Sequence, residues 1–190
     1  MTYVKWKAAD AIGKECRTGL NFTESGFGVR GAISVSDRYN SAASQLRPEE
    51  VDWEDIFTKK KARWFHTGGI YAGISETSPT VIIEAMKVAK RNGTIISYDL
   101  NYRSSLWKDR GGIKKAQEVN AQIVPFVDVL IGNEEDFHSS LGLETGNEAG
   151  DYSVLNVEKY KETMDEASRR YPNLSIVAST LRTVKTASKN

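Results

Sequence analysis

Short apolar runs alternate with helical patterns along most of this chain, and that alternation limits the possible fold more than any other feature. We predict strands at residues 62–66, 94–98, 127–131 and 174–179, and helices at residues 78–91, 112–123, 133–140 and 157–171. Ser78 is the candidate N-cap of the first helix, with Pro79 in its first turn. Strands that alternate with helices are typical of a parallel sheet with right-handed crossovers. The sequence therefore predicts an α/β fold.

The N-terminal part of the chain has a different texture. Residues 15–45 are rich in glycine and poor in helix formers, and residues 29–36 alternate like a strand. We therefore divide the chain into a β element with its connection, residues 1–48, and a partial α/β core, residues 49–190. Because the chain begins in the β element and stops soon after a strand, we expect it to be a piece of something larger.

Composition excludes several classes of function. The 26 basic and 25 acidic residues leave a net charge of +1, which offers no basis for binding nucleic acid or an anionic membrane. The single cysteine, Cys16, cannot form an intrachain disulfide, and this suits a reducing compartment. With no secretory signal and no long apolar segment, we expect a cytoplasmic protein.

Polar side chains follow the predicted strands at the point where each one ends. Asp99, Asn101 and Arg103 alternate with period two after the second strand, and an extended backbone would point all three the same way. The carboxyl ends of parallel strands share one edge, where ligands bind in open α/β sheets. The other strand ends carry His66, Thr67, Gly68 and Gly69; Asn133, Glu134, Glu135 and Asp136; and Ser179, Thr180 and Arg182.

Each of these groups also has a purely structural interpretation. Asn133 is a good N-cap, and acidic residues suit the first turn of a helix. Asp99 would then satisfy turn amides, with Arg103 as its ion-pair partner. In the functional interpretation Asn133 lies near phosphate and Asp136 holds Mg²⁺ through water. Gly68 and Gly69 serve either as a turn or as a place where a ligand approaches the backbone.

The motif Asp99-x-Asn101-x-Arg103-x-x-Leu106-Trp107 resembles a segment of ribokinase-like (PfkB) sugar kinases, particularly 2-keto-3-deoxygluconate kinases. Residues 133–136 stand where that family has Asn-x-x-Glu, and residues 180–182 where many members have Thr-x-Gly. Residues 38–44 resemble the strand that leaves the family's substrate lid. The resemblance covers about residues 15–188.

The resemblance implies a three-layer ribokinase-like fold, here incomplete, with a small β lid. It implies phosphoryl transfer from ATP to a sugar or sugar acid, with Mg²⁺ as cofactor and a homodimer through the lid. The site residues it implies are Arg38, Asp99, Asn101 and Arg103 for the substrate; Asn133, Thr180 and Arg182 for the nucleotide; and Asp136 for the metal.

Three departures from the family pattern matter. Asp136 replaces a Glu, Arg182 replaces a Gly, and the Gly-Ala-Gly-Asp segment that carries the family's catalytic base and anion hole is absent. We therefore predict part of a sugar-acid kinase, inactive as this chain alone. Two alternatives stay open: a kinase for a neutral sugar such as fructose or ribose, and a non-catalytic remnant that binds ligand.

Overall fold

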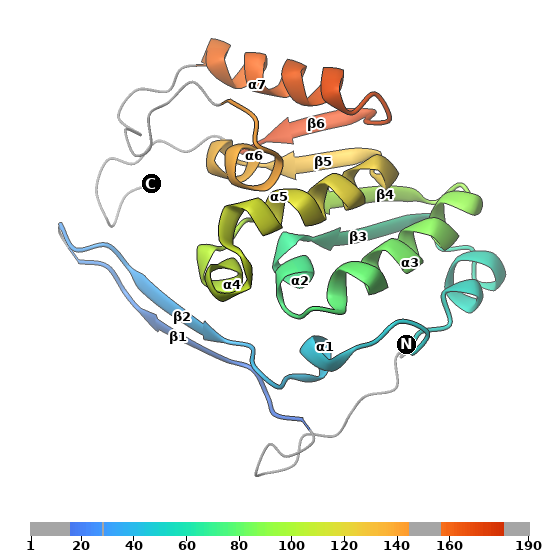
Figure 1. Ribbon diagram of the computed structural model, residues 1–190, viewed down its shortest axis with the longest axis horizontal. Coiled ribbons are helices and arrows are strands. Elements are labelled where there is room, and N and C mark those ends of the chain that lie inside the picture. Colours follow the sequence, from blue (N-terminus) through green and yellow to red (C-terminus); the bar gives the residue numbers. More distant parts are fainter. Residues whose placement is uncertain (1–15, 28, 145–156, 181–190) are drawn as a thin grey trace.

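The computed structural model describes residues 16–27, 29–144 and 157–180 (Figure 1). In chain order the elements are β1 (Leu20–Glu24), β2 (Ile33–Asp37), α1 (Ala42–Gln45), the π-helical turn η1 (Asp55–Lys59), β3 (Trp64–Gly68), α2 (Gly69–Gly73), α3 (Ser78–Arg91), β4 (Ile95–Asp99), α4 (Ser104–Trp107), the 3₁₀ turn η2 (Lys108–Arg110), α5 (Gly112–Ile123), the 3₁₀ turn η3 (Val124–Phe126), β5 (Val129–Gly132), α6 (Glu134–Leu141), α7 (Val157–Arg170) and β6 (Ile176–Ser179).

The main sheet has four parallel strands in the order β3-β4-β5-β6. Its register aligns Gly68 with Asp99, and Asp99 with Ile131, so the carboxyl ends of β3, β4 and β5 lie at one edge. This confirms the predicted α/β class and its parallel sheet.

Helices cover one face of this sheet in the described part of the chain (Figure 1). The core between them contains Met86, Ile96, Tyr98 and Leu130, all fully buried. Side chains alternate between the two faces of a strand, and those on the other face include several exposed apolar ones. These are Trp64, Ile95 and Ile176. The main sheet and the helices on it therefore form two layers in the described part of the chain, one of helices and one of strands.

Local signals set most of the element boundaries. Helix α5 has the predicted bounds, and α6 begins with the predicted Asn133 cap, whose side-chain oxygen accepts from the Asp136 amide. The N-cap of α3 is Thr77 rather than the predicted Ser78. The hydroxyl of Ser78 is buried within hydrogen-bond distance of the Ser75 carbonyl, so it stabilises the turn before the helix.

Strands β1 and β2 form a separate antiparallel ribbon (Figure 1). The predicted strand at residues 29–36 begins too early, because Phe27 and Arg30 exchange two backbone hydrogen bonds across a turn. Leu20, Phe22, Ile33 and Val35 share one face of the ribbon, and all are exposed. The opposite face is polar, with Thr23 and Ser34 bonded across the strands at 2.9 Å. The domain division at residue 48 stays a prediction.

None of the helices in the described ranges has both the length and the apolar character needed to span a bilayer.

Candidate functional site

The end of β4 is the centre of the candidate site, and two glycines of the neighbouring strand end let the chain pack around it. A Cβ on Gly69 would lie 1.9 Å from the Leu100 carbonyl oxygen, and one on Gly68 would lie 2.8 Å from the Asp99 carbonyl oxygen. Both distances are far inside van der Waals contact, so the turn between β3 and α2 requires residues without a side chain. The close approach at this glycine pair is therefore made by the chain's own backbone.

The strand does not continue to Arg103 as the period-two pattern predicts. Strand β4 ends at Asp99, and Asn101 has a φ of +35°, in the left-handed region that few residues other than glycine adopt. The chain turns there because it has to enter α4 three residues later. The prediction that Asp99, Asn101 and Arg103 project in parallel from one extended segment is thus wrong. The side-chain amide nitrogen of Asn101 nevertheless donates to the Asp99 carboxylate at 3.4 Å.

The carboxylate of Asp136 connects two of the predicted groups. One oxygen accepts from the Tyr102 amide at 2.7 Å, and the other accepts from the Asn133 amide at 2.9 Å. The Asp136 amide in turn donates to the Asn133 side chain at 2.9 Å, which completes a capping box at the start of α6. The structure therefore joins the loop after β4 to the loop after β5 through one buried side chain.

Arg103 is exposed, and its guanidinium donates to the Tyr102 carbonyl at 2.6 Å. Within the described ranges it forms no ion pair with Asp99, so the purely structural interpretation of the two residues as an ion pair is wrong. Its charge is left available to a ligand at this edge.

Asp99 lies in an environment that disfavours its charged form. Burial raises the pKa of its carboxyl above the usual value, and the negative charge of Asp136 raises it further. A hydrogen bond from the Asn101 backbone and the positive charges of His66 and Arg103 act in the opposite direction. A carboxyl balanced between such influences is typical of functional sites.

The predicted nucleotide residues are placed less completely. Asn133 is half-buried and its side-chain oxygen caps α6 as predicted, while its role toward a nucleotide stays a prediction. Thr180 is exposed directly after β6, and its amide donates to the Gly132 carbonyl at 3.2 Å. Arg182 lies outside the described residues.

Arg38 follows β2 on the ribbon and is half-buried. No hydrogen bond or ion pair among the described residues links its side chain to the edge of the main sheet. The structure thus brings Asp99, Asn101, Arg103, Asn133 and Asp136 together and leaves Arg38 on a separate element.

The magnesium prediction for Asp136 does not fit this geometry. Asp136 as a residue is only 4% exposed, and each carboxylate oxygen already accepts a backbone N–H. In the described part of the chain, no group of three or more His, Cys, Asp or Glu side chains could hold a metal ion. Asp136 is therefore engaged with the backbone rather than turned toward a metal-bound water.

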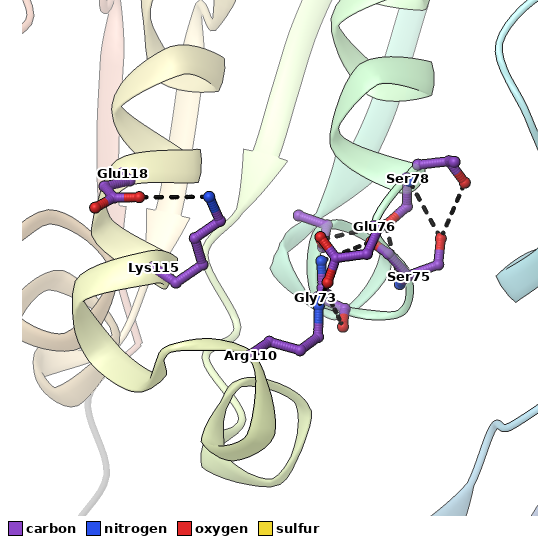
Figure 2. A network of polar contacts seen from close by, with 9 residues as sticks. Gly73, Ser75, Glu76, Ser78, Arg110, Lys115 and Glu118 are labelled. Carbon is purple, nitrogen blue, oxygen red and sulfur yellow. Dashed lines mark hydrogen bonds and ion pairs between the residues drawn. The ribbon is translucent and has the colours of Figure 1, made fainter.

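Sequence reasoning missed Arg110, which holds the segment after Arg103 in place (Figure 2). Its guanidinium donates to the carbonyls of Gly73 at 2.6 Å and Ser75 at 2.9 Å, and to the Glu76 carboxylate at 2.6 Å. It also lies 5.3 Å from the centre of the Trp107 ring. An arginine after a short helix carries no periodic signal, so the sequence alone could not reveal these partners.

A second missed cluster lies on the open face of the sheet. The Ser97 hydroxyl accepts from the Trp64 indole at 2.8 Å and lies 2.7 Å from His66 Nδ1. Alternating residues on paired strands put these three side chains on one face, a relation that is visible only once the register is known.

Comparison with known proteins places the fold and the motifs in context. No family model matches the chain. It is 31% identical over 142 residues to a 2-dehydro-3-deoxygalactonokinase of Haloferax volcanii, covering 75% of this chain and 41% of that protein. It is 38% identical over 101 residues to probable fructokinase-3 of Arabidopsis thaliana, covering 47% of this chain and 27% of that protein. The chain thus spans less than half the length of these curated relatives.

Solved structures give the same picture. The 2-dehydro-3-deoxygluconokinase of Thermotoga maritima superposes with a TM-score of 0.79 at 38% identity, over 90% of this chain and 48% of that one. A PfkB family carbohydrate kinase from Listeria grayi superposes with a TM-score of 0.74 at 26% identity, over 96% of this chain and 49% of that one. Both similarities extend over nearly the whole chain.

Proposed function

The chain belongs to the ribokinase-like (PfkB) family of carbohydrate kinases, and from this premise we propose that the protein transfers a phosphoryl group from ATP to a hydroxyl of a sugar acid of the 2-keto-3-deoxygluconate type. The observation that carries the proposal is the group at the end of β4. There an exposed Arg103, which forms no ion pair within 4 Å in the described part of the chain, stands beside Asp99 and Asn101. A guanidinium binds a carboxylate through two parallel hydrogen bonds, which suits the acid group of such a sugar.

We assign the remaining residues by their place. Asp99 and Asn101 contact the sugar between Arg103 and the phosphates, and Arg38 approaches the substrate from the ribbon. Asn133, Thr180 and Arg182 form the nucleotide side of the site. Magnesium enters with ATP and is held mainly by the phosphates, as is usual for this ion. Binding and charge neutralisation then account for most of what these residues do.

A neutral-sugar kinase is the second candidate, because fructokinases are among the relatives. The two candidates differ in the charge of the substrate that Arg103 meets. A neutral sugar offers hydroxyl groups that accept single hydrogen bonds, and it gains less from a fixed guanidinium than a carboxylate does.

We propose that the 190 residues alone do not turn over substrate, because the sequence contains no Gly-Ala-Gly-Asp segment to supply the base and anion hole. Ligand binding without turnover is the corresponding alternative for this chain. We place the reaction in the cytoplasm, where ATP is available and Cys16 stays reduced.

We also propose that the apolar face of the ribbon pairs with the same face of a second copy. Leu20, Phe22, Ile33 and Val35 expose between 50% and 63% of their surface on one side of two strands. A contiguous apolar patch of this kind marks an interaction surface.

The test uses the protein expressed from its complete coding sequence, with its intact mass measured first. Its turnover is then assayed with Mg-ATP on a panel of sugar acids, fructose and ribose. We expect turnover of a keto-deoxy sugar acid. Arg103→Ala is expected to raise its KM about 10- to 100-fold, the loss of one or two charge-assisted hydrogen bonds. Arg91→Ala, an exposed arginine paired with Glu54, is the matched control and should leave KM unchanged. Preferred turnover of fructose would favour the neutral-sugar kinase, and binding without turnover would favour the non-catalytic alternative.

A further inference from the structure

We infer that Asp136 is a positioning residue that sets the substrate arginine through Tyr102, rather than a ligand of the metal. The inference rests on the proposed function for the role of Arg103 as the substrate contact. In this inference Asp136 holds the loop after β4 against the loop after β5, through its bonds to the Tyr102 and Asn133 amides.

Both main-chain polar groups of Tyr102 are engaged. Its N–H donates to Asp136 at 2.7 Å, across 34 residues of sequence, and its carbonyl accepts from the Arg103 guanidinium at 2.6 Å. The Tyr102 side chain is itself buried in the core. The residue that precedes Arg103 is therefore fixed by its amide, its carbonyl and its ring.

The backbone just before Tyr102 needs such support. Asn101 has a φ of +35°, a left-handed conformation that asparagine adopts more readily than most residues but at a higher cost than glycine, so contacts on either side help to hold it. The bond from the Tyr102 amide to Asp136 closes the turn immediately after this residue. Without it, the chain between Asp99 and α4 would have a freer choice of conformation, and Arg103 would lose its fixed direction.

The Asp136 side chain has little room to do anything else. The end of β5 packs against it so closely that a Cβ on Gly132 would lie 3.2 Å from the Asp136 Cβ. Its second oxygen is held by the Asn133 amide at 2.9 Å. A carboxylate supplies acceptors at both oxygens, whereas an amide supplies only one, so the two backbone donors account for the choice of an acid here.

The geometry thus joins the two ends of the candidate site. The same side chain closes the first turn of α6, on the nucleotide side, and holds the loop that presents Arg103, on the sugar side. A change at Asp136 is expected to disturb sugar binding through Arg103 more than it disturbs the use of metal.

The test compares Asp136→Asn with Asp128→Asn in the protein expressed from its complete coding sequence. Asp128 is a matched control, since its carboxylate also accepts a backbone amide of β4, that of Ile96 at 2.9 Å, but at the opposite end of the strand. For Asp136→Asn we expect at least about tenfold faster hydrogen exchange at the Tyr102 amide. We also expect about a tenfold higher KM for the sugar acid, with the half-saturating Mg²⁺ concentration unchanged. Asp128→Asn should alter none of these.

A double variant separates positioning from a general structural effect. If Asp136 acts through Arg103, Asp136→Asn should raise KM in the parent protein and add nothing in an Arg103→Ala background. Additive effects, an unchanged Tyr102 exchange rate, or a shift confined to the Mg²⁺ dependence would each overturn the inference.

Two further outcomes are separable. If the parent protein phosphorylates no sugar, the proposed function fails, while hydrogen exchange at Tyr102 still decides whether Asp136 holds this loop. If Asp136→Asn does not fold, Asp136→Glu takes its place, since it keeps the charge but moves both acceptor oxygens by one methylene group away from the Tyr102 and Asn133 amides. It is expected to raise the sugar KM with kcat within about threefold, and a parental KM would contradict the inference.

Discussion

Replacement of Arg110 by alanine is expected to destabilise the protein strongly, although the residue contacts no predicted ligand. Its guanidinium is the shared donor for the carbonyls of Gly73 and Ser75, at the end of α2 and in the turn that follows (Figure 2). Carbonyls at the end of a helix have no partner within the helix, so a side-chain donor stabilises them. The side chain of Arg110 is only 17% exposed, which limits how far water can take its place.

The magnitude follows from the contacts. Each hydrogen bond from a charged donor contributes about 1.5 kcal/mol at the lower end of its usual range, and the contact with the Trp107 ring adds about 0.5 kcal/mol. The ion pair with Glu76 adds little, because that carboxylate is 75% exposed and screened by water. We therefore expect Arg110→Ala to lower the free energy of unfolding by about 3.5 kcal/mol.

Urea unfolding followed by circular dichroism is the assay. At a slope of about 2 kcal/mol per M, the midpoint should fall by about 1.75 M with the slope unchanged. Glu76→Gln is the control and should change stability by less than about 0.5 kcal/mol. A loss below about 1 kcal/mol for Arg110→Ala, or an equal loss for Glu76→Gln, would refute the assignment of stability to the two backbone carbonyls.

Three further predictions concern the sheet edge and the ribbon. Gly69→Ala should lower the free energy of unfolding by at least about 3 kcal/mol, since its Cβ would meet backbone at 1.9 Å. Gly31→Ala, with open space around it, is the control and should have almost no effect on the thermal midpoint. The pKa of Asp99 is raised in the folded state, so the contribution of its carboxyl to stability is present below the unfolded-state pKa and is lost as pH rises through the folded-state pKa. In urea titrations, Asp99→Asn should therefore gain stability over the parent as pH rises from 3 to 7. Phe22→Asp should abolish the proposed dimer in analytical ultracentrifugation, while Thr23→Asp on the polar face should not, and a dimer that survives Phe22→Asp would place the contact elsewhere.

The sequence was sufficient for the elements with strong local signals. The amphipathic pattern of α5 predicts its bounds, and Asn133 predicts the start of α6, because caps and periodicity act within one or two turns. It failed where the signal is weak. Helix α2 includes Gly69 and Gly73, which are poor helix formers, and it exists because packing against α3 and the end of β4 requires it.

The candidate site was predictable as a set of residues but not as an arrangement. The resemblance and the strand ends both pointed to Asp99, Asn101 and Arg103, and they do lie at the sheet edge. The left-handed turn at Asn101 and the bond between Tyr102 and Asp136 depend on contacts between segments 34 residues apart. No local pattern encodes such a contact, so the role of Asp136 became visible only in the structure.

After β3, each strand of the main sheet pairs with the strand that precedes it along the chain. As the polypeptide emerges from the ribosome, β3 is complete before β4 arrives, and the same holds for β5 and β6. Each of β4, β5 and β6 then adds to an edge that already exists. The edge that β4 presents before β5 is made is open only for the time needed to synthesise some 30 residues, a few seconds at the usual rate of elongation. Sequential strand order thus keeps brief the period in which an unpaired edge could recruit another chain.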